Sequence, residues 1–222
     1  MLPICGSSGG PGSATRVHEL PVRPILTQTS TTTASVSIHN GIRRFRLDGT
    51  AEKMVFGPAD KILPLSNCTI VLGLRKTDAT NRDSAAFGVD VGTNTPRCEA
   101  AIPKADGDVQ FIWKNGAGSN LLVSDLTFGD DVWGFTTGAR GMEIWQNGYL
   151  RTSSATNLTR VSTSEDFTWG EGKYSDLADL VEYTHMLIWK HQMNKSQMVE
   201  LTGDHYSSLK LLQKRDAARL VA

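Results

Sequence analysis

The chain has 222 residues, of which 39% are hydrophobic and 21% are charged, and this composition excludes an intrinsically disordered protein. Its 23 basic and 23 acidic side chains give a formal net charge of zero, which argues against nucleic acid as the main partner because phosphate binding needs a basic excess. The chain has no apolar run of about 18 residues and no signal-peptide pattern at its start, so we expect neither a membrane span nor secretion. The three cysteines form no metal or disulfide pattern, as is typical of folding in a reducing cytoplasm.

Residues 1–34 differ in character from the rest of the chain. They carry Gly, Ser and Pro and end in the polar run Thr27–Thr33, which has no apolar face to bury. Because proline removes backbone donors, the pattern predicts an extended or flexible N-terminal arm. The arm could dock on a neighbouring subunit as an added strand, and the alternative is an ordinary flexible terminus. The apolar residues expected to make the arm contacts are Leu20, Val22, Ile25 and Leu26.

From residue 35 the sequence alternates with period two and is punctuated by turn residues, which is typical of β-strands. Asn40-Gly41 and Asn147-Gly148 have the composition of tight hairpin turns. The almost continuously apolar run Cys68–Arg75 predicts a central strand covered on both faces. Short strands separated by turns favour an all-β sandwich over a βαβ fold. The predicted strands are 35–39, 42–47, 53–56, 68–75, 85–91, 109–113, 132–137, 142–146, 149–152 and 184–189.

A helix is predicted only after the last strand, in residues 194–222. Asn194 can cap it, and Gln197 completes a capping box. Gly203 weakens this helix or splits it in two. The residues on its apolar face are Met198, Leu201, His205, Leu209 and Leu212. The sequence therefore predicts three parts: the arm, a β-sandwich over residues 35–193, and a C-terminal helix that packs on the sandwich or extends from it.

Five motifs in this order resemble the concanavalin-like lectin and laminin-G-like domains, in the form common among bacteriophage virion proteins. The motifs are Leu47-Asp-Gly, Leu63–Leu74, the hairpin Met142–Leu150, the strand Tyr183–Trp189 and the closing segment Met193–Leu201. The resemblance covers about residues 35–212. It implies an antiparallel two-sheet jelly roll with one concave sheet and with contacts at loops on one edge. It also implies a frequent role in glycan binding, although many phage members are structural.

The family includes glucanases, whose chemistry needs a specific arrangement of carboxyl groups. Retaining glycosidases need two carboxyl groups about 5 Å apart, and the family enzymes supply them from alternating positions of one strand. Here Glu143 stands alone on its strand, while Glu165 and Asp166 are adjacent and would point in opposite directions. The β-rich part of the chain, residues 35–193, also lacks a Gly-x-Ser-x-Gly nucleophile elbow. We therefore predict that the protein is not an enzyme.

Two kinds of ligand site are predicted. Calcium, which several members of the family hold, has weak candidates in Asp90, Asp130 and Asp131, with a solvated acidic turn as the alternative. Trp169 lies in a glycine-containing segment close to Tyr174, where an exposed aromatic loop would grip a sugar or anchor a subunit. Internal packing of Trp169 is the open alternative. The expected ligand or partner contacts are Trp169, Tyr174, Asp130 and Asp131.

The leading hypothesis is a non-catalytic bacteriophage virion protein that decorates or cements the capsid, or forms part of a fibre. Its partners would be other virion proteins and further copies of itself in a homo-oligomer. The arm, the absence of a signal peptide and the phage-like resemblance motivate this hypothesis. The alternative is a lectin-like module that binds host-surface polysaccharide, and a glycoside hydrolase is a third, weaker possibility.

Overall fold

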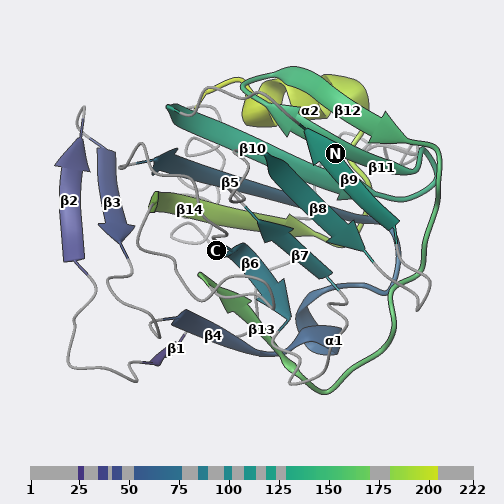
Figure 1. Ribbon diagram of the computed structural model, residues 1–222, viewed down its shortest axis with the longest axis horizontal. Coiled ribbons are helices and arrows are strands. Elements are labelled where there is room, and N and C mark those ends of the chain that lie inside the picture. The colour runs from purple at the N-terminus through teal and green to yellow at the C-terminus, as the bar shows by residue number, and fades with distance from the viewer. Residues whose placement is uncertain are drawn as a thin grey trace, which may run out of the picture.

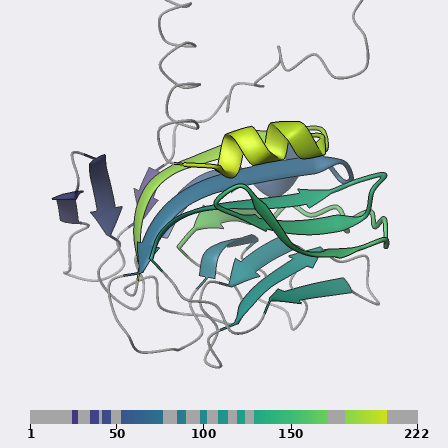
Figure 2. The ribbon, with the colours of Figure 1, turned by 90° about the horizontal axis from the view of Figure 1, so that it is seen from above.

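The computed structural model describes residues 25–27, 35–39, 42–46, 53–76, 85–89, 98–101, 108–113, 119–123, 129–170 and 181–204. These residues form two seven-stranded antiparallel sheets, which face each other as a sandwich (Figures 1 and 2). Sheet A has the order β1 (Ile25–Thr27), β4 (Lys53–Pro58), β13 (Asp166–Trp169), β6 (Ala85–Val89), β7 (Cys98–Ala101), β8 (Val109–Trp113), β9 (Ser119–Val123). Sheet B has the order β12 (Tyr149–Ser154), β11 (Met142–Gln146), β10 (Asp130–Thr137), β5 (Cys68–Lys76), β14 (Val181–Trp189), β3 (Ile42–Arg46), β2 (Ser35–His39). The predicted all-β jelly-roll sandwich is confirmed.

The core between the sheets is rich in aromatic side chains, because alternate residues of each strand point inward. Phe87 of sheet A packs edge-to-face on Phe135 of sheet B, with ring centroids 5.5 Å apart. Phe111 and Phe135 lie 5.2 Å apart across the same interface. Both thiols of Cys68 and Cys98 are buried here, and burial raises the pKa of Cys68 to about 12, so this thiol is held in its unreactive form.

Strand β5 is central in sheet B and is covered on both faces, as its sequence predicted. Ile70 and Leu72 belong to the core between the sheets, whereas Val71 belongs to a second apolar cluster on the outer face. The helix α2 (Lys195–Thr202) covers this second cluster with Met198 and Leu201. In Figure 2 α2, drawn in yellow, lies on the outer side of sheet B.

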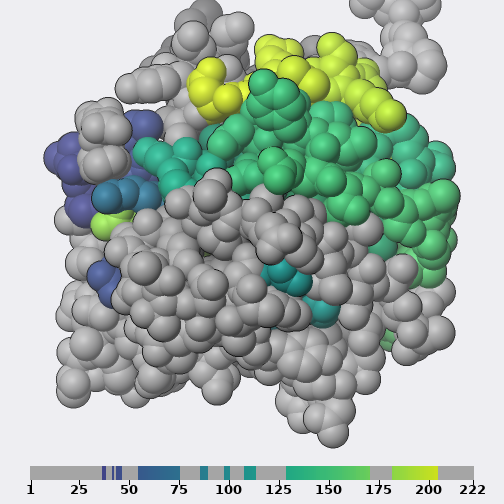
Figure 3. Space-filling view, turned by 45° about the horizontal axis from the view of Figure 1, so that its top comes forward, coloured from purple at the N-terminus to yellow at the C-terminus, as the bar shows by residue number. Residues whose placement is uncertain are grey.

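The start of α2 is confirmed in detail. The Asn194 side chain accepts a hydrogen bond from Gln197 N at 2.9 Å, and the Gln197 side chain accepts one from Asn194 N at 2.9 Å. The described helix ends at Thr202, next to Gly203. Figure 3 shows the yellow helix and the green segment of residues 130–170 as one continuous surface. The predicted extension through His205, Leu209 and Leu212 lies outside the described residues.

The helix approaches the sheet closely because of one glycine. A Cβ atom on Gly134 of β10 would lie 2.4 Å from Met198 Cε and 2.7 Å from Thr202 Cγ2. A larger side chain at this position would push against both residues of α2. The absence of a side chain at Gly134 therefore sets how deeply α2 seats on sheet B.

The hairpin between β11 and β12 is also confirmed. Asn147 and Gly148 have positive φ values of 50° and 83°, as a two-residue hairpin turn requires. Asn147 Oδ1 accepts a hydrogen bond from Val132 N at 2.9 Å, and Asn147 Nδ2 donates one to Asp131 Oδ1 at 2.6 Å. The predicted β2–β3 hairpin pairs in the matching register, with His39 opposite Ile42, and its turn residues Asn40-Gly41 lie outside the described residues.

Four strands and one helix were not predicted. They are β1, β7, β9, β13 and the short helix α1 (Ala59–Ile62). β1, β13 and α1 have four residues or fewer, too few to show a periodicity, and β1 and β13 pair with strands distant in sequence. β7 and β9 pair with their neighbours in sequence, and their short runs of mixed polarity carry no clear alternation. Strand β1 lies in the predicted arm and pairs with β4 of the same chain, with Ile25 opposite Val55 and Leu26 opposite Met54. The other two predicted arm contacts, Leu20 and Val22, lie outside the described residues.

None of the described helices is long and apolar enough to span a membrane.

Candidate functional site

The candidate site lies where an irregular crossing segment, residues 155–165, passes from β12 in sheet B to β13 in sheet A. This segment is the green trace that descends past α1 in Figure 1. Arg160 N donates to Leu65 O at 2.8 Å, and Ala59 N donates to Glu165 O at 2.8 Å. The segment is therefore tied by its backbone to the residues around α1.

The Arg160 side chain is the main anchor of the crossing segment, and the residue is only 2% exposed. A guanidinium has five N–H donors, and all five make hydrogen bonds here. The acceptors are Pro64 O (3.1 Å), Asp60 Oδ1 (2.6 Å), Val161 O (3.0 Å), Ala59 O (3.4 Å) and Leu63 O (2.7 Å). Three of these carbonyls belong to α1 and the residues after it. Arg160 thus satisfies the end of a helix too short to stabilise itself.

Asp60 lies at the same corner and is held in its ionised form. Its Oδ2 accepts hydrogen bonds from Thr163 N at 2.9 Å and from the Ser162 hydroxyl, while Oδ1 pairs with Arg160. Burial alone would raise the pKa of Asp60, but the hydrogen bonds from Ser162, Arg160 and Thr163 outweigh it and lower the pKa below its ordinary 3.8. Asp60 is therefore a structural anion that holds the crossing segment from the α1 side.

These contacts frame a shallow polar depression with a volume of about 600 Å³. It is lined by Pro58, Asp60, Lys61, Ser162, Thr163, Ser164 and Glu165. Lys61, Ser164 and Glu165 are exposed, and the hydrogen bonds that anchor the crossing segment do not involve the Lys61 ammonium or the Ser164 hydroxyl. Asp60 and Glu165 balance Lys61 and the adjacent Arg160, so the depression has mixed donors and acceptors without net charge. Leu65 and Val161 are partly exposed apolar residues beside Arg160.

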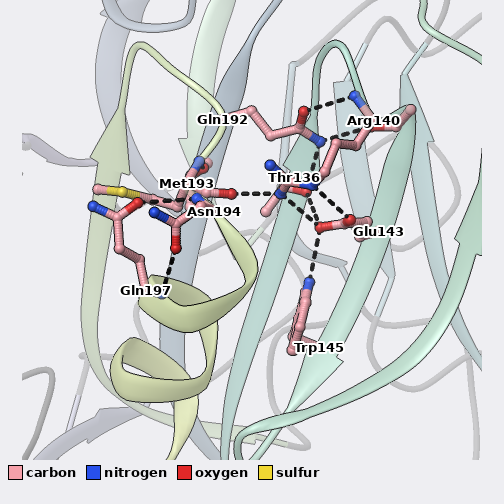
Figure 4. Close-up of polar contacts among 10 residues, drawn as sticks. Thr136, Arg140, Glu143, Trp145, Gln192, Met193, Asn194 and Gln197 are labelled. Carbon is pink, nitrogen blue, oxygen red and sulfur yellow. Dashed lines mark hydrogen bonds and ion pairs between the residues drawn. The ribbon is translucent and has the colours of Figure 1, made fainter. Parts of the chain in front are cut away.

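A second polar cluster joins sheet B to the start of α2, and its centre is Glu143 (Figure 4). Glu143 is 2% exposed. It accepts hydrogen bonds from Arg140 Nε (3.1 Å), Arg140 Nη2 (3.1 Å), Thr136 Oγ1 (3.0 Å) and Trp145 Nε1 (3.1 Å). Arg140 Nη2 also donates to Met193 O at 2.5 Å, next to the Asn194 cap. Burial would raise the pKa of Glu143, but the hydrogen bonds from its partners, of which that from Arg140 contributes most, lower the pKa below 4.5.

Substitution of Glu143 by glutamine is expected to lower the free energy of unfolding at pH 7 by about 1–3 kcal/mol, because buried donors lose a charged acceptor. A lowered pKa in the folded state contributes stability above pH 4.5, and this contribution is lost as the pH falls through the folded pKa. The difference in free energy of unfolding between wild type and Glu143→Gln should therefore become smaller as the pH is lowered. Urea unfolding at pH 7 and at about pH 3.5 measures it, with exposed Glu200→Gln as the control. A difference that does not change with pH would contradict this role.

The expectation that Trp169 lies on an exposed loop is wrong. Trp169 ends strand β13 and is 6% exposed. Its ring packs on Phe45 with centroids 4.7 Å apart and on Tyr183 with centroids 5.3 Å apart. The alternative of internal packing is the observed one, because pairing with β4 and β6 turns this side chain into the core. Tyr174 lies outside the described residues.

The structure separates the two acidic residues predicted beside this loop. Asp130 and Asp131 are neighbours on β10, so their side chains leave opposite faces of sheet B. Asp130 pairs with Arg44 Nη2 at 2.5 Å, while Asp131 accepts hydrogen bonds from Gly129 N and Asn147 Nδ2. Within the described ranges no group of three His, Cys, Asp or Glu residues is placed to hold a metal ion. Asp90, the third calcium candidate, lies outside them.

The depression was missed by sequence reasoning. Arg160 and Asp60 are 100 residues apart, and neither lies in a recognisable motif. Ser162–Ser164 reads as a polar connection, and its only signal was its position directly before an acidic pair, Glu165-Asp166. These residues come together only because the crossing segment passes from sheet B to sheet A beside α1.

No protein-family model and no curated protein sequence matches the chain. Solved structures do match. The binding domain of Paraclostridial Mosquitocidal Protein 1 superposes with a TM-score of 0.63 at 12% identity, over 81% of this chain and 47% of that one. The receptor binding domain of a botulinum neurotoxin C/D mosaic serotype superposes with a TM-score of 0.59 at 12% identity, over 80% of this chain and 45% of that one.

A third match is the CBM40 domain of the Ruminococcus gnavus IT-sialidase, with a TM-score of 0.51 at 15% identity, over 63% of this chain and 84% of that one. The chain thus spans about half the length of the two toxin domains and most of the length of the CBM40 domain. At these identities the likeness concerns the fold. The chain has the β-sandwich fold of a group of solved structures that includes receptor-binding and carbohydrate-binding domains.

Proposed function

We propose that the protein is a non-catalytic carbohydrate-binding module and that the depression beside α1 receives the sugar. The observation that carries the proposal is the charge-balanced, hydroxyl-lined depression of about 600 Å³. A neutral sugar offers many hydroxyl groups, each both donor and acceptor, and therefore suits a surface that mixes an ammonium, a carboxylate and hydroxyls. Leu65 and Val161 supply nearby apolar surface for the C–H faces of a sugar ring.

The anchoring of the depression supports recognition. Arg160 and Asp60 fix the crossing segment through buried or partly buried hydrogen bonds, so Ser162 and Ser164 are presented on a rigid frame. Preorganised polar groups lose less conformational entropy when a ligand binds. The similarity in fold to carbohydrate-binding and receptor-binding domains is consistent with this use of the surface.

The absence of catalysis is proposed from the state of the carboxylates. A glycosidase needs one carboxylic acid with a raised pKa beside a second carboxylate. Asp60 has a lowered pKa and both of its oxygens accept hydrogen bonds, so it is unsuited to donate a proton. Glu143 is also ionised, saturated with donors and buried beneath α2.

A glycan array probed with the intact chain tests the proposal. Substitution of Lys61 and Ser164 by alanine is expected to weaken binding to the best glycan by about tenfold or more, because each lost hydrogen bond is worth about 0.5–1.5 kcal/mol and a charged one more. Lys195→Ala, an exposed lysine on α2, is the matched control and should bind like wild type. Equal binding by all variants would place the sugar elsewhere on the protein.

A blank array with folded protein would contradict the carbohydrate proposal and leave a structural role in a bacteriophage virion as the second candidate. The edge position of β1 in sheet A favours this candidate, since an edge strand can accept a strand from a neighbouring subunit. In that role the partners would be capsid or fibre proteins and further copies of this chain.

A further inference from the structure

The outer face of sheet B carries two arginines on β3, Arg44 and Arg46, and several of their donors are not used. Arg44 and Arg46 alternate with Phe45, which packs on the inner core, so both guanidiniums leave the strand on the outer side. The side chain of Arg44 has no exposed surface, and Arg46 is half-buried. This place is on the opposite sheet from β4 and β13, the strands that flank the depression described above.

Two of the three arginines on this face form ion pairs with acidic side chains, and the third does not. Arg44 Nη2 pairs with Asp130 Oδ2 of β10 at 2.5 Å. Arg75 Nη1 pairs with Glu182 Oε2 at 3.5 Å, and Glu182 Oε1 accepts a hydrogen bond from Ser37 at 3.0 Å. In the described part of the chain Arg46 forms no ion pair. The cluster of three arginines and two carboxylates therefore has one positive charge in excess.

Three buried N–H groups of this cluster have no acceptor: Arg44 Nε, Arg44 Nη1 and Arg46 Nε. Buried polar groups in proteins are almost always hydrogen-bonded, and an unpaired group on a cation is especially costly. A water molecule would supply acceptors but would leave the excess charge. An oxyanion supplies both several acceptor oxygens and the missing negative charge.

We propose that Arg44 and Arg46 bind one oxyanion, a carboxylate, sulfate or phosphate group, on the outer face of sheet B. The two guanidiniums are two residues apart on one strand, about 7 Å along the chain, a separation that one tetrahedral or planar oxyanion bridges with long arginine side chains. The site goes beyond the proposed sugar depression and does not depend on it. The anion is either a free inorganic ion or an acidic group of a larger glycan.

Thermal unfolding in sulfate and in chloride at equal ionic strength is the first test. Sulfate stabilises most proteins because it is excluded from their surface. The test therefore compares the rise in melting temperature among wild type and two variants. Arg46→Gln removes the unpaired cation without breaking the Arg44–Asp130 pair, and Arg151→Gln on exposed β12 removes a cation elsewhere. We expect the melting temperature of wild type and Arg151→Gln to rise in sulfate by about 4 °C more than that of Arg46→Gln. An equal rise in all three proteins overturns the site.

Calorimetric titration with inorganic sulfate, inorganic phosphate and a sulfated oligosaccharide then identifies the source of the anion. Binding of any of these probes should be at least about tenfold weaker in Arg46→Gln, since a charge-assisted hydrogen bond and one charge are lost. Tighter binding of the oligosaccharide than of the free ions assigns the site to an acidic glycan, and equal binding assigns it to a free ion. Titrations that do not distinguish Arg46→Gln from wild type overturn the proposal even where the sugar depression binds its ligand.

Discussion

Replacement of Arg160 by alanine is expected to lower the free energy of unfolding by about 3–5 kcal/mol. The substitution removes all five hydrogen bonds of a buried guanidinium at once. It leaves Asp60 without its ion pair and leaves the carbonyl groups of Leu63 and Pro64 without a donor. Urea unfolding of the purified chain, with the slope checked for two-state behaviour, measures the change.

Arg151→Ala is the matched control, because Arg151 lies on the exposed edge strand β12 and should change stability by less than about 0.5 kcal/mol. Arg160→Lys should recover only part of the loss, since an ammonium has three donors and cannot reach five acceptors in one plane. A loss below about 1 kcal/mol for Arg160→Ala would contradict the anchoring role. The rigid frame proposed for sugar binding would then have lost its physical basis.

The parts of the fold that were predictable are those whose information is local. The hairpin at Asn147-Gly148 depends on two residues that tolerate positive φ, and the cap of α2 depends on Asn194 and Gln197, three residues apart. Strand β5 was predictable as a central strand because its apolar run reflects burial against the core on one face and against α2 on the other. In each case the pattern itself is contained within a few residues, even where the burial that it reflects comes from distant elements, as in β5.

The remaining features depend on partners far away in the sequence. Strand β13 has only four residues, and its pairing with β4 and β6 decides that Trp169 faces the core rather than solvent. The depression needs Arg160 and Asp60 to meet across 100 residues, and the anion site needs Arg44 of β3 to reach Asp130 of β10 across two intervening strands. A sequence pattern does not predict such long-range ion pairs, because single arginines and aspartates usually lie on solvated surfaces.

Gly141→Ala is the second substitution with a large expected effect, a loss of about 3–5 kcal/mol. Gly141 has φ of 84°, a conformation that costs an L-residue about 1–2 kcal/mol. In addition, a Cβ atom there would lie 1.8 Å from the backbone oxygen of Ser154 on β12, and backbone cannot give way as a flexible side chain does. The turn or the edge strand must therefore move.

Such a movement would spread through the polar cluster of Glu143. Gly141 O accepts a hydrogen bond from Gln192 Nε2 at 2.9 Å, and Gly141 and Gly138 exchange two backbone hydrogen bonds that shape the turn carrying Arg140. A displaced turn would take Arg140 away from Glu143 and from the carbonyl of Met193, so the seating of α2 would weaken with it. Loss of near-ultraviolet circular dichroism together with the lower unfolding midpoint would report this coupling.

Gly57→Ala separates the two causes, because Gly57 also has a positive φ, 100°, but a Cβ atom there meets nothing within 4 Å. It should show the conformational cost alone, about 1–2 kcal/mol, with near-ultraviolet dichroism unchanged. The difference between the two substitutions then measures the contact between the β10–β11 turn and β12. Equal losses at the two glycines would mean that β12 yields freely, and the turn would no longer explain how sheet B holds α2.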